Sequence, residues 1–172
     1  MIFLTIGTHE PFERLVRAVD AWAGQPGDRP TVFGQIAAVE PKSYRPRNFE
    51  WVERLDPTEY STRFAEADLI VSHAGMGSIL TALNTGKPIV VMPRRGHLRE
   101  TRNDHQFTTV NMLCDRPGIY VAEDETKLAE VLERAVFDLA NPPASQRISA
   151  FAEPRFTEAL RRFILQSGSG KD

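Results

Sequence analysis

Cysteine is nearly missing from this chain of 172 residues, in which Cys114 is the single example. One cysteine excludes an internal disulfide and a cysteine-rich zinc site, and it fits a reducing compartment. We expect Cys114 to fill space in the interior rather than to act as a nucleophile. The four histidines show no ligand spacing, so the sequence predicts no metal site.

Long hydrophobic runs are missing as well. No stretch approaches the roughly 20 apolar residues that a membrane-spanning helix needs. The apolar start at residues 1–6 is too short, and too poor in positive charge, for a secretory signal peptide. We therefore expect a cytoplasmic protein whose contact with a membrane is peripheral or passes through a partner.

The chain also lacks an excess of either charge. Its formal net charge of −2 gives no general reason to expect nucleic acid as a partner. The hydrophobic fraction of 41% and the charged fraction of 26% are those of a soluble globular protein. The length suits one well-buried domain. We expect that domain over residues 1–166, followed by a flexible polar tail over residues 167–172.

The most informative stretch is a short apolar run at residues 69–71 that leads into a glycine-rich turn. Gly75 and Gly77 remove side chains where the backbone turns or where a ligand approaches. Residues 78–85 have the pattern of a helix, which Gly86 ends. The free N–H groups at the start of such a helix can hold phosphate. The motif is neither a Walker loop nor a full dinucleotide fingerprint, and glycines here can also simply close the turn.

Apolar runs and helical stripes alternate along the rest of the chain. This alternation predicts an α/β fold, a single Rossmann-like domain with a mostly parallel sheet and helices on both faces. Strands are expected at residues 2–6, 31–35, 49–53, 69–71, 88–93 and 119–122. Helices are expected from Pro11 to Trp22, at residues 57–66 and 78–85, from within 94–106 to Cys114, and at residues 128–139 and 156–164.

Three polar loops follow predicted strands, and ligands of such sheets bind beyond the carboxyl ends of the strands. The first loop contains Gly7 and Thr8, the second spans residues 73–78, and the third spans residues 94–106. We expect all three at one edge of the sheet. The N–H groups of the first two turns, with the hydroxyls of Thr8 and Ser78, could hold a diphosphate without a P-loop.

The third loop carries the groups suited to phosphate and sugar. Arg94 and Arg95 offer guanidinium forks for phosphate oxygens, or else form a solvated or protein-contacting surface. Residues 103–106 mix donors and acceptors as sugar hydroxyls require, or else simply cap a helix. His73, directly before the glycine turn, is either a functional group or a structural histidine that closes its strand.

Taken as an ordered set, these motifs resemble a known family. The set is Ser-His-Ala-Gly-Met-Gly-Ser at 72–78, Gly-Lys-Pro at 86–88 and Asn-Asp-His-Gln at 103–106. It is similar to the C-terminal, donor-binding domain of the family 28 glycosyltransferases. That family has the GT-B architecture, in which two Rossmann-like domains enclose the active site. The opening residues 3–8 and the segment 93–95 resemble stand-alone bacterial subunits of exopolysaccharide gene sets.

The resemblance implies a UDP-sugar as substrate and no cofactor. It places the diphosphate near the two glycine turns and the donor sugar near the third loop. The implied donor-binding residues are Gly7, Thr8, His73, Ala74, Gly75, Met76, Gly77, Ser78, Thr81, Arg94, Arg95, Asn103, His105 and Gln106. One departure stands out, because Thr81 occupies the position where many members carry a glutamate that holds the ribose hydroxyls. A hydroxyl does not replace the bidentate acceptance of a carboxylate.

The resemblance further implies an inverting, metal-independent glycosyltransferase that is active with a partner. The length leaves no room for an acceptor-binding half, so we expect a membrane-associated partner subunit to bind a lipid-linked saccharide during polysaccharide biosynthesis. The chain would then lie at the inner face of the cytoplasmic membrane. The general base is expected on the partner, with His9 as a weaker local candidate for the catalytic residue. The predicted helix at 156–164 either forms part of the partner surface or packs on its own domain.

Two other interpretations remain open at this point. One is a non-catalytic nucleotide-sugar-binding or assembly module, which the threonine at position 81 favours. The other is an unrelated Rossmann-like phosphate binder, which a preference for adenine nucleotides would reveal.

Overall fold

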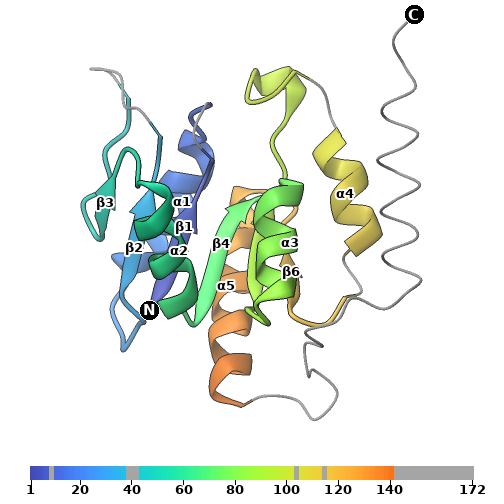
Figure 1. Cartoon of the computed structure of the whole chain (residues 1–172). Helices are drawn as coiled ribbons and strands as arrows, with labels where there is room; N and C mark the ends of the chain where they lie inside the picture. Colours follow the sequence, from blue (N-terminus) through green and yellow to red (C-terminus); the bar gives the residue numbers. More distant parts are fainter. Residues whose placement is uncertain (8–9, 38–42, 103–104, 114–115, 142–172) are drawn as a thin grey trace, which may run out of the picture.

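A computed structural model describes residues 1–7, 10–37, 43–102, 105–113 and 116–141 (Figure 1). Six strands form one sheet in the order β3-β2-β1-β4-β5-β6, and every pair of neighbours is parallel. The strands are β1 (Ile2–Thr5), β2 (Val32–Gln35), β3 (Glu50–Val52), β4 (Leu69–His73), β5 (Ile89–Met92) and β6 (Ile119–Val121). This is the strand order of the doubly wound Rossmann fold, and its direction of winding reverses between β1 and β4.

The central strands are mostly apolar because both of their faces are covered. All residues of β1 and β5 are buried, as are Leu69, Ile70 and Val71 of β4. Alternate residues enter different cores, so that Ile2 packs on one side of the sheet and Phe3 on the other. The predicted short apolar run was therefore a doubly covered strand.

Helices cover both faces of the sheet. The apolar stripes of α1 (Glu13–Ala23) and α5 (Glu125–Ala140) share one core, and the two helices pack against each other. The opposite core contains residues of α2 (Pro57–Glu66), α3 (Met76–Asn84) and α4 (His105–Leu113). Figure 1 shows α2 and α3 in front of the sheet and α5 behind it. The predicted α/β fold class is confirmed, with a sheet that is wholly parallel among the described strands.

Element boundaries differ from the predictions mainly at helix starts. α3 begins at Met76 rather than at residue 78, because Gly75 with its extended backbone already serves as the N-cap. α1 begins at Glu13, which leaves Pro11 before the helix rather than in its first turn. Gly86 has a φ of +64° and ends α3 in the left-handed region, as predicted. The predicted helix at 156–164, the tail and Cys114 lie outside the described residues.

Candidate functional site at the carboxyl edge of the sheet

Three loops meet at the carboxyl edge because their strands are neighbours. β1 pairs with β4, and β4 pairs with β5. The segments that follow them begin with Ile6, Ala74 and Pro93, and Gly7 is the second residue of the first segment. The predicted convergence is thus confirmed for the described residues. Thr8, His9, Asn103 and the side chain of His105 lie outside what the structure describes.

The imidazole of His73 is enclosed by the glycines of two loops. A Cβ built on Gly7 would lie 3.4 Å from Cε1 of His73, and one built on Gly75 would overlap the ring. Gly7 also has a φ of +84°, which favours glycine. Nδ1 of His73 lies 3.4 Å from Oγ of Ser72, whose hydroxyl donates to the carbonyl of Thr5 at 2.8 Å. His73 therefore joins the loops after β1 and β4.

His73 is neutral at physiological pH. Its pKa is lowered to about 4, first by burial and then by the nearby guanidinium of Arg94, while a hydrogen bond with the backbone of Thr5 acts in the opposite direction. The ring therefore offers hydrogen-bonding nitrogens but no positive charge to a ligand. Any positive potential for a phosphate must come from other groups at this edge.

The N-terminus of α3 supplies such potential. Its cap residue, Gly75, offers no side chain, and the first helical bond runs from the Ile79 N–H to the Gly75 carbonyl at 3.3 Å. The N–H groups of Met76, Gly77 and Ser78 precede that bond, so no carbonyl of α3 accepts from them. The outer side of Gly77 is open, since a Cβ built there would meet nothing within 4 Å.

The neighbouring helix α2 is different. The side chain of Asp56 accepts from the N–H groups of Thr58 at 2.8 Å and Glu59 at 2.9 Å. A carboxylate therefore already occupies the N-terminus of α2 and would repel an anion there. Of these two helices, only α3 has an N-terminus suited to phosphate.

A cavity of about 650 Å³ lies between the two helix starts. It opens at the point where the sheet reverses its winding, the usual ligand position of this fold. Its walls are formed by Thr5, Gly7, Gln35, Arg54, Leu55, Asp56, Pro57, Tyr60 and Ser78. Gln35 braces this wall, because its Oε1 accepts the N–H of Leu55 at 3.0 Å.

Sequence reasoning missed the wall formed by residues 54–57 and Tyr60. The sequence contained a signal for this wall. Residues 54–57 follow the predicted third strand, just as the three predicted polar loops follow other strands. The same rule about carboxyl ends would have included them.

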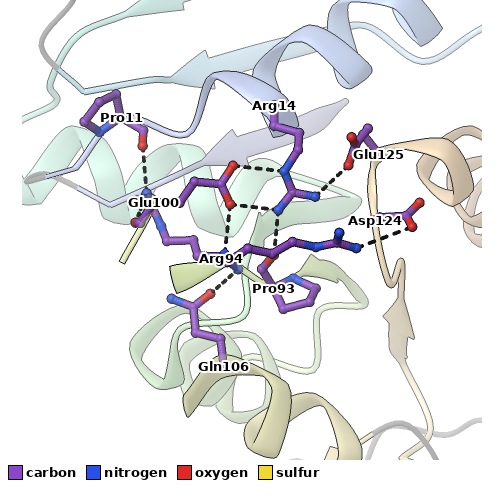
Figure 2. Close-up of polar contacts among 9 residues, drawn as sticks. Pro11, Arg14, Pro93, Arg94, Glu100, Gln106, Asp124 and Glu125 are labelled. Carbon is purple, nitrogen blue, oxygen red and sulfur yellow. Dashed lines mark hydrogen bonds and ion pairs between the residues drawn. The ribbon is translucent and has the colours of Figure 1, made fainter. Parts of the chain in front are cut away.

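Arg94 is buried and fully engaged within the protein, with 3% of its surface exposed. One terminal nitrogen donates to the carbonyls of Pro11 at 2.7 Å and Glu100 at 3.1 Å. The other donates to the carbonyls of Ile6 at 2.9 Å and Glu10 at 2.8 Å. Figure 2 shows the guanidinium directed at this backbone. From the sequence, this guanidinium is expected to bind phosphate, but in the structure it is bonded to the protein backbone. Arg94 thereby joins the loop after β5 to the loop after β1.

Arg95 extends toward Asp124 and a cavity beside β6. Its guanidinium lies 3.5 Å from the carboxylate of Asp124, and it lines a second cavity, of about 840 Å³, beside β6. Its buried Nε has no hydrogen-bond partner among the described residues.

Gln106 and Thr81 each make one side-chain hydrogen bond within the protein. Oε1 of Gln106 accepts the N–H of Arg94 at 2.9 Å, which leaves the amide nitrogen for another partner. The hydroxyl of Thr81 donates to the carbonyl of Gly77 at 2.9 Å, on the exposed face of α3. Ala74 is buried, and its N–H bonds to the carbonyl of Met92 at 3.0 Å.

Membrane-spanning helices and metal-binding clusters are both absent from the described residues. No helix there combines the length and the apolar character needed to traverse a bilayer. No three histidine, cysteine, aspartate or glutamate side chains in those ranges gather in a way that could hold a metal ion.

Comparison with known proteins agrees with this geometry. The sequence profile described as "Glycosyltransferase family 28 C-terminal domain" matches residues 1–163. The chain is 29% identical over 96 residues to the UDP-N-acetylglucosamine–N-acetylmuramyl-(pentapeptide) pyrophosphoryl-undecaprenol N-acetylglucosamine transferase of Rickettsia felis. It is 38% identical over 79 residues to the UDP-N-acetylglucosamine transferase subunit ALG13 of Mus musculus.

These relatives are much longer than the matched regions. The matches cover 56% of this chain and 25% of the Rickettsia protein, and 44% of this chain and 6% of the mouse protein. Among solved structures, MurG of Acinetobacter baumannii superposes with a TM-score of 0.63 at 18% identity, over 95% of this chain and 49% of that one. The glycosyltransferase of kitacinnamycin superposes with a TM-score of 0.57 at 21% identity, over 94% of this chain and 42% of that one. At these identities the structures show the shared GT-B half-fold.

Proposed function

Since the chain belongs to the glycosyltransferase family 28 C-terminal domain family, we propose that it is the donor-binding, catalytic part of a UDP-sugar glycosyltransferase. The observation that carries this proposal is the uncapped N-terminus of α3 beside an open cavity at the switch point of the sheet. A nucleoside diphosphate needs both a positive N–H cluster for its phosphates and a neighbouring hollow for its nucleoside.

The start of α3 and the neighbouring cavity bind different parts of the donor in this proposal. The diphosphate lies against the N–H groups of Met76, Gly77 and Ser78, and Gly7 lines the same cavity as Ser78. The nucleoside enters the cavity, where Tyr60 offers an aromatic edge and Arg54 a cation at the wall. The sugar extends along the carboxyl edge toward Gln106.

In an inverting transfer, the acceptor hydroxyl attacks the anomeric carbon as the bond to UDP breaks. The protein's main contribution is then to stabilise the negative charge that develops on the leaving diphosphate. In this proposal the N–H groups and the dipole of α3 supply that stabilisation. Arg94 contributes indirectly, because its four hydrogen bonds to backbone carbonyls set the relative position of the first and third loops. The proton of the acceptor passes to a base on the partner, or to His9.

The names of two relatives support a proposal for the acceptor and the partner. Both describe UDP-N-acetylglucosamine transfer, one of them to a pyrophosphoryl-undecaprenol carrier and the other as a subunit. We propose that this chain likewise serves a lipid-linked saccharide in polysaccharide biosynthesis. A membrane-associated acceptor-binding subunit would hold it at the inner face of the cytoplasmic membrane.

A non-catalytic nucleotide-sugar-binding module is the second candidate. The observation in its favour is Thr81, whose hydroxyl is already bonded within α3 and brings no carboxylate to the ribose. This candidate shares the donor site and differs in turnover. Transfer of radiolabelled sugar to a lipid-linked acceptor, with the co-expressed partner, separates the two.

The site itself is tested by calorimetric titration with UDP, ADP and GDP, with and without magnesium. We expect selective, metal-independent binding of UDP. Met76→Pro is the diagnostic variant, because proline is tolerated at the first helical position yet removes one N–H from the proposed phosphate site. Its matched control is Met76→Ala, which keeps that N–H. Proline should weaken UDP binding about tenfold and alanine by less than about twofold. Equal affinities in the two variants would refute the phosphate position.

A further inference from the structure

Glu100 closes the loop that follows β5. Its carboxylate accepts the N–H of Arg95 at 2.9 Å, and its own N–H donates to the carbonyl of Arg95 at 3.3 Å. Its carbonyl accepts from the guanidinium of Arg94 at 3.1 Å. Residues 95–100 therefore form a closed turn, in which Gly96–Leu98 make a single 3-10 turn and Arg99 has a φ of +58°.

Arg14 of α1 anchors this closed turn from across the sheet edge. Its Nε donates to Glu100 Oε1 at 2.9 Å, and one terminal nitrogen donates to Oε2 at 2.8 Å (Figure 2). The same nitrogen reaches the carbonyl of Pro93 at 3.0 Å, and the other pairs with Glu125 at 2.6 Å. Both side chains of the Arg14–Glu100 pair are only 12% exposed. A bidentate pair with so little exposure is geometrically specific, unlike a surface ion pair.

The anchored turn is connected directly to Gln106. The N–H groups of Arg94 and Arg95 are consecutive, and one is bonded to Gln106 and the other to Glu100. Both bonds measure 2.9 Å, and both depend on the path of the backbone just after β5. If the Arg14–Glu100 pair opens, the N–H of Arg94 shifts and Gln106 loses the bond that orients its amide.

We propose that Glu100, held by Arg14, is a positioning residue that fixes the amide of Gln106 toward the donor sugar. This inference rests on the proposed function, because it takes the sugar to lie beside Gln106. Glu100 itself touches no substrate. It acts by holding the backbone on which the side-chain oxygen of Gln106 is fixed, so that the amide nitrogen is presented in one orientation.

The test separates recognition of the sugar from recognition of the nucleotide. The ratio of Kd for UDP to Kd for a UDP-sugar measures what the sugar contributes. The sugar nucleotide is whichever of UDP-N-acetylglucosamine, UDP-glucose and UDP-galactose the wild-type chain binds most tightly. Glu100→Gln places an amide N–H against Arg14 or the N–H of Arg95, and Arg14→Lys keeps the charge but loses the fork. The matched control is Glu130→Gln, which removes an exposed carboxylate from a surface pair on α5.

We expect Glu100→Gln and Arg14→Lys to lower the Kd ratio about three- to tenfold while the Kd for UDP changes by less than about twofold. Gln106→Ala should lower the ratio to a similar extent. The double variant Glu100→Gln/Gln106→Ala should lose no more than Gln106→Ala alone, because both changes act through one amide. Glu130→Gln should match the wild type.

A second readout needs no donor. Hydrogen exchange of the Arg94 amide in the free chain should quicken at least about tenfold in Glu100→Gln, since its acceptor is no longer held. Equal loss of UDP and UDP-sugar affinity, additive losses in the double variant, or unchanged exchange at Arg94 would each overturn the proposal. Absence of any uridine nucleotide binding by the wild type would instead refute the proposed function. The exchange rates would then still decide whether Glu100 holds Gln106.

Discussion

The imidazole of His73 occupies the space into which a Cβ on Gly75 would project. Gly75 has a φ of −89° and a ψ of 135°, torsions that any residue adopts. Glycine is therefore required here by the neighbouring ring and not by the backbone. The same ring also contacts the Cβ position of Gly7, so one side chain sets the spacing of the two glycine turns.

Gly75→Ala should destabilise the chain by about 1–3 kcal/mol, because a methyl group forces the His73 ring out of its place. Urea unfolding measures the change. The double variant His73→Ala/Gly75→Ala should recover part of the loss. A Gly75→Ala variant as stable as the wild type would contradict the overlap.

Gly77→Ala is the matched change, since a Cβ there meets nothing within 4 Å. Within α3 it should raise the free energy of unfolding by about 0.5–1 kcal/mol, because alanine loses less backbone entropy than glycine. UDP affinity should fall if the phosphate approaches this N–H closely. Urea unfolding measures the gain in stability, and calorimetry on the same sample measures the loss of UDP affinity.

Stability should fall on acidification through His73. Its pKa is about 4 in the folded chain, against an ordinary value of 6.5, so the unfolded state binds more protons between these values. This contribution is fully present above pH 6.5 and is lost as the pH falls toward 4. At pH 4.5 the loss should reach about 2.5 kcal/mol relative to pH 7. The His73→Asn variant should lack this part of the pH dependence, and identical pH profiles would exclude the assignment.

Replacing Arg94 should damage the fold and not only the site. Arg94→Met leaves the carbonyls of Ile6, Glu10, Pro11 and Glu100 without their donor, which should cost about 3 kcal/mol or more. Arg99→Met is the control, because that side chain is exposed. If thermal unfolding gave the same Tm for both variants, the buried contacts of Arg94 would contribute little to stability.

Thr81→Glu should strengthen nucleotide binding about tenfold, because a carboxylate can accept from both ribose hydroxyls. Position 81 is exposed on α3, so the longer side chain has room. The gain should shrink with 2′-deoxy-UDP, which lacks one hydroxyl. A gain that is the same for both nucleotides would place the ribose elsewhere.

Much of this protein could be predicted from local pattern. The alternation of apolar runs with helical stripes indicated the α/β class, because strands covered on both faces must be apolar and helices must bury one stripe. The glycine turn after β4 and its position at the carboxyl edge followed from the same reasoning, since parallel neighbours end at one edge.

The roles of the charged residues could not be predicted in this way. Arg94 and Arg95 are adjacent in a polar run, yet one is buried among carbonyls and the other extends toward Asp124. Three of those carbonyls belong to the loop after β1, 83 to 88 residues away in the chain. Nothing local in the sequence distinguishes the two arginines.

The sequence by itself determined the fold class, the family and the edge of the sheet at which the polar loops meet, because these follow from periodicity and from an ordered set of short motifs. Only the tertiary structure decided which polar groups form hydrogen bonds within the protein and which remain available to a ligand. Asp56 fills the start of α2, Glu100 turns inward to Arg14, and the start of α3 stays open. A hydrogen bond between distant segments depends on where the folded backbone brings its donors and acceptors, and residue type alone carries no record of that position.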